Sequence, residues 1–351
     1  MKGAAPPKAP APFPVPASSP RRSLGLRPAL ASAAYLSLIT AVARASGFDL
    51  LLFPELAALT TVVVGTPHHP WARSPRLLVL TPLLTGAVGV ALASTLAYGP
   101  LSVGLVVTIS LLLIRALRSS VMPALSAGLL PLALGLQSWH YPVSLLPGTL
   151  GLALLESLRQ RRRSPLTPES TPAGARTPPQ SIDPAAQAAP LALRAVLPSA
   201  ASEFPPLRRW LAPLVLFLAG ALLLVRLLGS PLVFYPPLLV LAWETLARPE
   251  HCPWRGRLLA VLAATGSAAL IGLLLVRWLG PVPLATLLAV LLVALLLDRL
   301  RLTCPPAFAV ALLPFVVHSP SADFPLHVLA GTGWLVVVAV VTAALRRRRG
   351  G

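Results

Sequence analysis

One stretch of the chain occurs twice, and it constrains the fold more than any other feature. Residues 117–131 and 300–314, which lie 183 positions apart, are identical at seven of fifteen positions. The same offset also pairs residues of rarer types: His68 with His251, Trp71 with Trp254, and Gly89 with Gly272. A shared compositional bias matches leucines, but it does not keep Trp, His and Gly in one register. We therefore interpret the chain as a tandem duplication.

The composition indicates the environment in which these repeats fold. Hydrophobic residues make up 56% of the 351 residues and charged residues 11%, whereas about a quarter of the residues of a soluble domain are charged. The mean hydropathy is +0.78. We expect an all-α, polytopic membrane helical bundle of two tandem pseudo-symmetric repeats, each with short segments interrupted by proline.

Shifts in composition divide the chain into five parts. Two of them, a basic N-tail and an Arg/Pro/Ser/Ala-rich cytoplasmic linker, are predicted to be disordered because they contain too few apolar residues to form a core. The parts are the N-tail at 1–27, the first transmembrane repeat at 28–158, the linker at 159–209, the second transmembrane repeat at 210–345 and a basic C-tail at 346–351.

Six apolar segments are predicted in each repeat. Those of the first repeat are 29–46, 48–66, 77–98, 101–117, 121–136 and 143–158; those of the second are 210–228, 231–247, 258–279, 282–297, 305–317 and 326–345. Segment 305–317 would form about 20 Å of helix, against about 30 Å of hydrocarbon. Four long spans and two short re-entrant segments per repeat therefore describe the sequence as well as six full spans, so that eight or twelve spans are possible.

The positions of the basic residues predict an orientation. If the N-terminus is inside, all 29 Lys and Arg residues except Arg44, Arg226 and Arg277 fall in the tails, the linker or inward connections. Basic residues concentrate in cytoplasmic loops. We expect a multi-pass protein of the cell membrane, a bacterial inner membrane, with both termini in the cytoplasm.

The repeated stretch begins with prolines that are suited to start a helix. Proline at the first helical position loses no hydrogen bond, and a preceding hydroxyl can cap the end. A helix start inside a membrane presents N–H groups and the positive end of the dipole to an anion. The candidate substrate-binding residues are Arg118, Ser120, Pro123, Arg301, Thr303, Pro305 and Pro306. The alternative is that these prolines only begin or kink packed helices.

Glu55 and Glu244 are the acidic residues that lie deepest in apolar segments. A carboxylate in the membrane is costly enough to suggest coupling or proton relay. We select Glu55 as the coupling candidate. The alternative is a structural ion pair with Arg44 or Arg226.

The remaining polar motifs favour structural roles. His68, His69 and His251 with Trp71 and Trp254 are interpreted as anchors at the membrane interface, not as a metal site. The arginine runs at 161–163 and 346–349 are interpreted as topology signals and contacts with anionic lipid, not as a nucleic-acid site. The chain has no phosphate loop, nucleophile elbow or zinc-ligand spacing, so we expect no cofactor, no metal and no enzyme.

Three motifs carry a resemblance to a known family. Phe53-Pro54-Glu55, Pro67-His68-His69-Pro70 and Pro123-Ala124 resemble elements of the HPP family of integral membrane proteins, which is named after a His-Pro-Pro motif at the start of a short membrane segment. The resemblance covers about 110 residues of each repeat and is closer in the first. At the signature itself, the first repeat has Val121-Met122-Pro123 and the second has Cys304-Pro305-Pro306.

Two functions are compatible with these observations. Some HPP proteins are linked to nitrite transport in chloroplasts and cyanobacteria, so the resemblance implies a transporter of a small solute, an anion such as nitrite. The alternative is a membrane scaffold that does not transport and that recruits a partner through its basic linker. The expected partners are the lipid bilayer and a small-molecule or anion substrate; the sequence does not indicate an oligomeric state.

Overall fold

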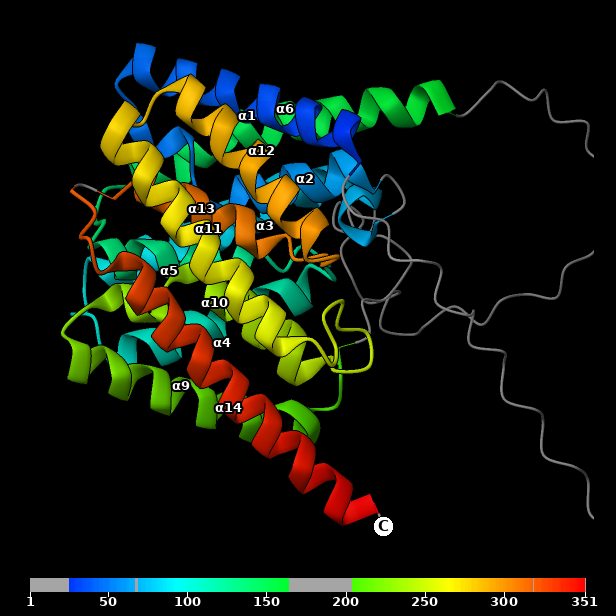
Figure 1. Ribbon diagram of the computed structural model, residues 1–351, viewed down its shortest axis with the longest axis vertical. Helices are drawn as coiled ribbons and strands as arrows, with labels where there is room; N and C mark the ends of the chain where they lie inside the picture. Colours follow the sequence, from blue (N-terminus) through cyan, green and yellow to red (C-terminus); the bar gives the residue numbers. More distant parts are fainter. Residues whose placement is uncertain (1–24, 67–68, 164–203, 318, 351) are drawn as a thin grey trace, which may run out of the picture.

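The computed structural model describes residues 25–66, 69–163, 204–317 and 319–350. Within these ranges every regular element is a helix and no strand occurs, so the predicted all-α bundle is confirmed (Figure 1). The N-tail up to residue 24 and the centre of the linker, residues 164–203, lie outside the described residues.

The helices of the first half follow one another with short connections. They are α1 (Leu26–Ser46), η1 (Asp49–Leu51), α2 (Glu55–Gly65), η2 (Pro70–Arg73), α3 (Pro75–Ala93), α4 (Pro100–Ala116), α5 (Ala124–Leu134) and α6 (His140–Arg163).

The second half has the same order of elements. They are α9 (Leu207–Leu228), η3 (Pro231–Phe234), α10 (Pro236–Ala242), the π-helical turn η4 (Trp243–Ala247), α11 (Leu258–Leu279), α12 (Pro283–Arg299), α13 (Pro306–Leu312), η5 (Leu313–Phe315) and α14 (Phe324–Gly350). Helix α12 begins 183 positions after the start of α4, and it ends 183 positions after the end of α4. This order supports the interpretation of the sequence as a duplication.

The four segments that were expected either to span fully or to be re-entrant are short helices in the structure. Helices α2 and α5 have 11 residues each, and α10 and α13 have 7. Eleven residues make about 16 Å of helix, which is too short for a hydrocarbon core of about 30 Å. Each half therefore has four longer helices and two short ones, and each short helix begins at or directly after a proline, which suits the first position of a helix.

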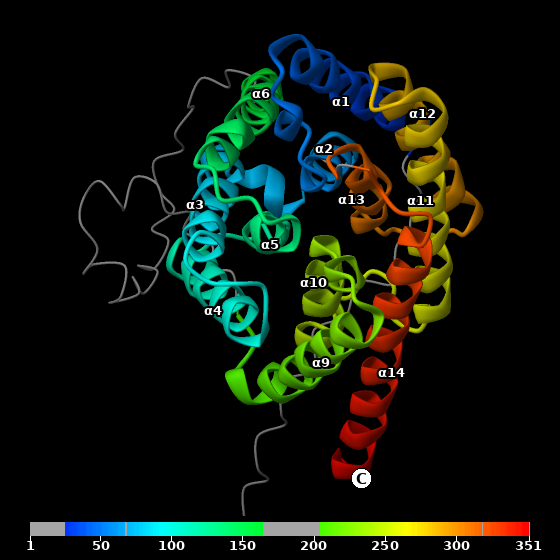
Figure 2. The same ribbon diagram turned by 90° about the vertical axis from the view of Figure 1, so that its left-hand side faces the viewer.

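The short helices lie inside the bundle. Viewed as in Figure 2, α2, α5, α10 and α13 are enclosed by the longer helices α1, α3, α4, α6, α9, α11, α12 and α14. The residues of α10 and α13 are all buried, as are those of α2 and α5 apart from their last residue. Short helices with irregular ends are tolerated at membrane depth when protein surrounds them, which is the arrangement seen here.

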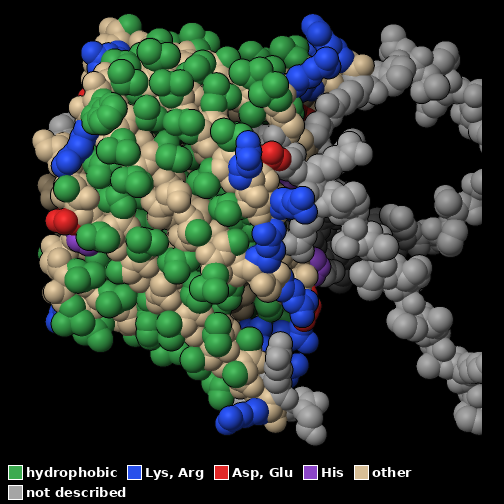
Figure 3. All heavy atoms as spheres, viewed as in Figure 1, with side chains coloured by type: hydrophobic (Ala, Val, Ile, Leu, Met, Phe, Trp, Pro, Cys, Tyr) green, Lys and Arg blue, Asp and Glu red, His purple; other side chains and the backbone are tan. Residues whose placement is uncertain are grey.

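The outer surface is suited to a lipid bilayer. Helices α1, α3, α9, α11 and residues 324–346 of α14 are long and apolar enough to cross a membrane. Apolar side chains cover the middle of the face shown in Figure 3, and Lys and Arg side chains gather along its right-hand edge. The chain is thus a membrane protein with several candidate spans.

The predicted boundaries of the linker and C-tail are wrong by several residues. Helix α6 continues through Arg163, and α9 begins at Leu207, so both ends of the predicted linker at 159–209 are helical. Helix α14 continues through the basic run to Gly350. Arginine is a good helix former, and cations near a helix C-terminus interact favourably with its dipole.

Candidate functional site

The centre of the molecule is the junction of the four short helices. Helix α5 of the first half packs against α10 of the second, and α2 packs against α13. The hydroxyl of Ser126 on α5 donates a hydrogen bond of 2.7 Å to the carbonyl of Pro236, the first residue of α10. Ser126 is fully buried. A polar bond thus joins the two halves at a helix that begins with proline, and no sequence pattern indicated a role for this serine.

Glu55 is the first residue of α2 and lies at this junction. Its side chain is 1% exposed, and neither carboxylate oxygen has a hydrogen-bond partner within the described ranges. Arg44, which was considered as an ion-pair partner, is exposed at the end of α1, as is Arg226 at the end of α9. The predicted structural ion pair is therefore not present at Glu55.

A buried tyrosine connects the surroundings of Glu55 with α5. Tyr141, at the start of α6, is close enough to Glu55 for an electrostatic interaction. Its hydroxyl donates a hydrogen bond of 2.9 Å to the carbonyl of Ala127. A carboxylate that lacks a hydrogen-bond partner among the described residues, a phenol and the first turn of α5 are thus neighbours in the core of the first half.

The second half has a hydroxyl cluster at the start of α10. The hydroxyls of Tyr235 and Thr332 are 2.6 Å apart, and those of Thr332 and Thr265 are 3.2 Å apart. The three side chains are fully buried. Cys304, just before α13, is close enough to Tyr235 for an electrostatic interaction. These residues are far apart in the sequence, which gave no signal of the cluster.

The predicted caps of the short helices are not formed. Neither α5 nor α13 has a side-chain cap, and Thr303 is exposed. The hydroxyl of Ser119, next to the predicted Ser120, accepts a hydrogen bond from the backbone N–H of Val121 and another from Thr81. Proline at positions 123, 305 and 306 lies at the starts of the helices, as predicted.

The N–H groups at these helix starts are also occupied. In α5, the N–H groups of residues 124–127 donate to carbonyls of residues 121–123, and in α13 those of Ala307 and Phe308 donate to Cys304 and Pro305. These are tight turns that continue into the helices. An anion at α5 or α13 would therefore meet the positive end of a helix dipole but no unoccupied N–H group of these residues.

Comparison with known proteins identifies the second half. Residues 239–350 match the family model of the HPP transmembrane region. The second half is therefore similar to the transmembrane region of the HPP family. The expected resemblance is confirmed, although the match lies in the half whose motifs resemble the family less closely. No curated protein and no solved structure matches the chain.

The HPP region contains two of the hydroxyl-cluster residues, Thr265 and Thr332, and one of the two candidate arginines. Arg301 follows α12 with a φ of 47°, and Arg118 follows α4 with a φ of 49°. After each arginine, the backbone N–H of the next residue donates a hydrogen bond to a carbonyl in the preceding helix. Ser119 donates to the carbonyl of Ile114 in α4, and Leu302 donates to that of Leu297 in α12. The two arginines thus end α4 and α12, and they occupy corresponding positions ahead of α5 and α13.

The aromatic residues that follow α2 and η4 are not interface anchors. Trp254, in the HPP region, is buried and donates a hydrogen bond of 2.9 Å to the hydroxyl of Thr245. Trp71 is also buried and makes an edge contact with His69. Both tryptophans pack in the protein interior, whereas His68 lies outside the described residues.

Glu244, the second acidic residue selected from the sequence, lies in η4. It interacts electrostatically with Arg248 and His251, which follow it closely in the chain. A carboxylate with cationic neighbours of its own is compensated locally. This arrangement favours a structural role for Glu244.

Proposed function

We propose that this protein is a secondary transporter, not an enzyme, and that it moves a small solute between its two halves. The observation that carries the proposal is Glu55, a buried carboxylate without a hydrogen-bond partner in the described residues, at the start of a short helix in the core. An unpaired buried carboxylate lowers stability, and proteins keep such groups mainly at functional sites. Intramembrane carboxylates serve proton relays and coupling. Short helices at the interface of two repeats are where transporters bind their substrates.

The proposed substrate is a small anion such as nitrite. Helices α5 and α13 direct the positive ends of their dipoles toward the short connections that precede them, and Arg118 and Arg301 lie at the far ends of these connections, just after α4 and α12. The HPP family match is compatible with this substrate class. Protonation of Glu55 would remove a negative charge that opposes the entry of an anion into the core of the first half.

The orientation is proposed from the charge distribution. Lys and Arg side chains gather at one edge of the bundle, and such an edge faces the cytoplasm. We place both termini and the linker in the cytoplasm of a bacterial cell, and the bundle in its inner membrane.

Uptake by reconstituted proteoliposomes tests the substrate. We expect nitrite or a related oxyanion to enter faster than a neutral solute of similar size, and we expect an inward proton gradient to increase its rate. The double variant Arg118→Ala and Arg301→Ala should lower anion uptake by roughly tenfold, because each charge near an entrance contributes about 1 kcal/mol or less. Anion uptake at the full rate in this variant would remove both arginines from the proposal.

Deletion of residues 167–200 distinguishes the proposed transport function from the alternative function as a scaffold. These residues lie within the predicted linker and outside the described residues. A transporter whose site is formed by the helices should retain its uptake rate after the deletion. A scaffold that acts through the linker should lose its partner. Loss of uptake by a deletion variant that is still folded would contradict the proposal that the helices alone form the transport site.

A further inference from the structure

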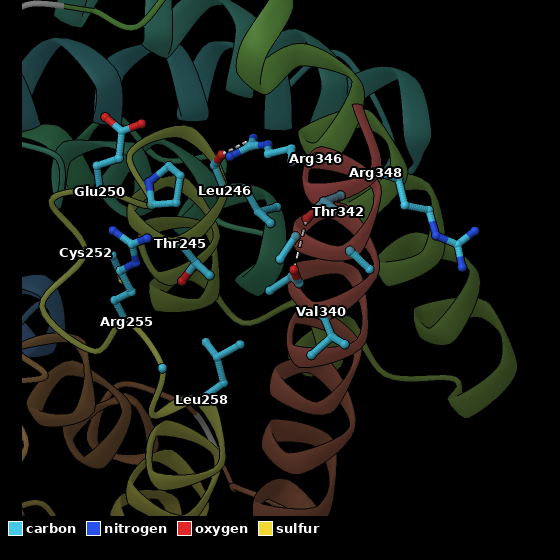
Figure 4. Close-up of a pocket in the computed structure, with 15 residues that line it drawn as sticks. Thr245, Leu246, Glu250, Cys252, Arg255, Leu258, Val340, Thr342, Arg346 and Arg348 are labelled. Atoms are coloured by element: carbon cyan, nitrogen blue, oxygen red, sulfur yellow. Dashed lines mark hydrogen bonds between the residues drawn. The ribbon is translucent and has the colours of Figure 1, made fainter. Parts of the chain in front are cut away.

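A cleft of about 770 Å³ lies in the second half, away from the central junction. It is formed by the loop between η4 and α11, the start of α11 and the last turns of α14 (Figure 4). Its apolar wall consists of Leu246, Pro249, Leu258, Ala339, Val340, Ala343 and Ala344. Its volume falls within the range of about 300–1,000 Å³ that is typical of ligand pockets.

The charged residues of the cleft lie above its apolar floor. Figure 4 shows Glu250 and Arg346 near the upper end, Leu258 and Val340 near the lower end, and Arg348 on the outer side of α14, pointing away from the loop. Arg255 lies on the wall opposite α14. Arg346 donates hydrogen bonds to the carbonyls of Arg209 (2.8 Å) and Leu246 (3.1 Å), and it thereby joins α14 to α9 and η4. The cleft is thus basic at one end and apolar at the other.

Both threonine hydroxyl groups of the cleft form hydrogen bonds within the protein. Thr245 accepts a hydrogen bond from the indole of Trp254, and Thr342 donates one to the carbonyl of Val338 in its own helix. The wall between the charged end and the apolar end is therefore suited to a hydrocarbon chain and not to a polar solute.

The corresponding positions in the first half carry longer side chains. Gln160 on α6 donates one hydrogen bond of 2.8 Å to the carbonyl of Ala72 and another of 3.3 Å to Glu156. At the offset of 183 positions, Ala343 corresponds to Gln160 and Ala339 to Glu156, while Arg255 corresponds to Ala72. The second half thus has alanine at both positions that carry long side chains in the first half, and it has an arginine where the first half has Ala72.

We propose that this cleft binds one anionic phospholipid of the leaflet on the arginine-rich side. Its phosphate lies between Arg255 and Arg346, on the wall that α14 shares with η4, and one acyl chain lies along the alanines of α14. The charges are complementary, because three arginines and one carboxylate leave the cleft with a net positive charge. Basic pockets between transmembrane helices on the cytoplasmic side bind anionic headgroups. This site is independent of the proposed transport function.

Native mass spectrometry of the full chain in a neutral detergent tests the site. Phosphatidylglycerol and phosphatidylcholine with the same acyl chains are titrated separately. We expect one phosphatidylglycerol to be retained with an affinity roughly tenfold higher than that of phosphatidylcholine, and we expect Arg255→Gln to weaken its binding by roughly fivefold. Ala343→Gln and Ala339→Leu each fill the cleft, one with a polar and one with an apolar side chain, and both should abolish the preference.

Two variants serve as controls, and three results overturn the proposal. Val341→Gln, on the same helix but outside the cleft, and Arg299→Gln, at the exposed end of α12, should bind both lipids as the unmodified protein does. Equal affinity for the two lipids would overturn the proposal, as would an unchanged preference in both cleft-filling variants. Displacement of the lipid by millimolar inorganic phosphate would overturn it as well and would assign the site to a free anion.

Discussion

Substitution of Glu55 by Gln is expected to abolish proton-driven accumulation of the solute. A pH gradient of about one unit supplies about 1.36 kcal/mol per proton, which is enough for roughly tenfold accumulation by a carrier that moves one proton with each solute molecule. Gln keeps the shape of the side chain but does not ionise, so the variant should equilibrate the solute without concentrating it. The measurement is the ratio of internal to external solute in proteoliposomes with an imposed pH gradient.

The stability of the Glu55 variants distinguishes a coupling role from a structural one. Because both oxygens of Glu55 lack hydrogen-bond partners in the described part of the chain, its removal should not lower the thermal midpoint. Glu55→Leu introduces the residue found at the corresponding position 238 of the second half, and we expect it to raise the midpoint while abolishing accumulation. Asp298→Asn, an exposed position at the end of α12, is the control. Accumulation in the Gln variant at the level of the unmodified protein would exclude Glu55 as the coupling residue.

Substitution of Gly272 by Ala is expected to destabilise the packing of α11 against α13. A Cβ atom at Gly272 on α11 would clash with the carbonyl oxygen of Ala311 on α13, and one at Gly89 on α3 would clash with that of Gly128 on α5. The obstacle is backbone, which cannot move without displacing a short helix. We expect a loss of about 1–3 kcal/mol or more, measured as a lower thermal midpoint in detergent.

Gly104→Ala is the matched control for this experiment. Gly104 lies in the interior of α4, and nothing lies within 4 Å of a Cβ atom added there. Alanine is favoured over glycine in a helix interior by about 0.5–1 kcal/mol, so this variant should be as stable as the unmodified protein or more stable. Equal midpoints for Gly272→Ala and Gly104→Ala would show that α11 and α13 are not in close contact in the folded protein.

Periodicity and residue type were sufficient to predict the secondary structure class. Long apolar runs predicted the long helices, and the prolines at positions 123, 305 and 306 predicted where α5 and α13 begin, because proline suits the first position of a helix. The sequence did not predict that α6 and α14 continue through their arginine runs, because such runs are compatible both with a helix and with a solvated tail.

The candidate site was predicted only in part. Glu55 was identifiable from the sequence, since a carboxylate within an apolar segment is conspicuous. The caps at Ser120 and Thr303 were wrong, because tight turns occupy the N–H groups that a cap or an anion would have used. The bond from Ser126 to Pro236 and the cluster of Tyr235, Thr332 and Thr265 join elements that are about 70–110 positions apart in the chain, and no local pattern signals such pairs.

The sequence by itself determined the environment and the class of fold, because hydropathy, proline positions and arginine placement act locally and do not depend on which helices meet. Only the tertiary structure decided that Glu55 has no hydrogen-bond partner among the described residues, that Trp71 and Trp254 are buried, and that Ala343 lines a cleft in the second half. The physical reason is that burial and hydrogen-bond pairing depend on distances between segments far apart in the chain, and these distances are set by the packing of the short helices inside the ring of longer ones.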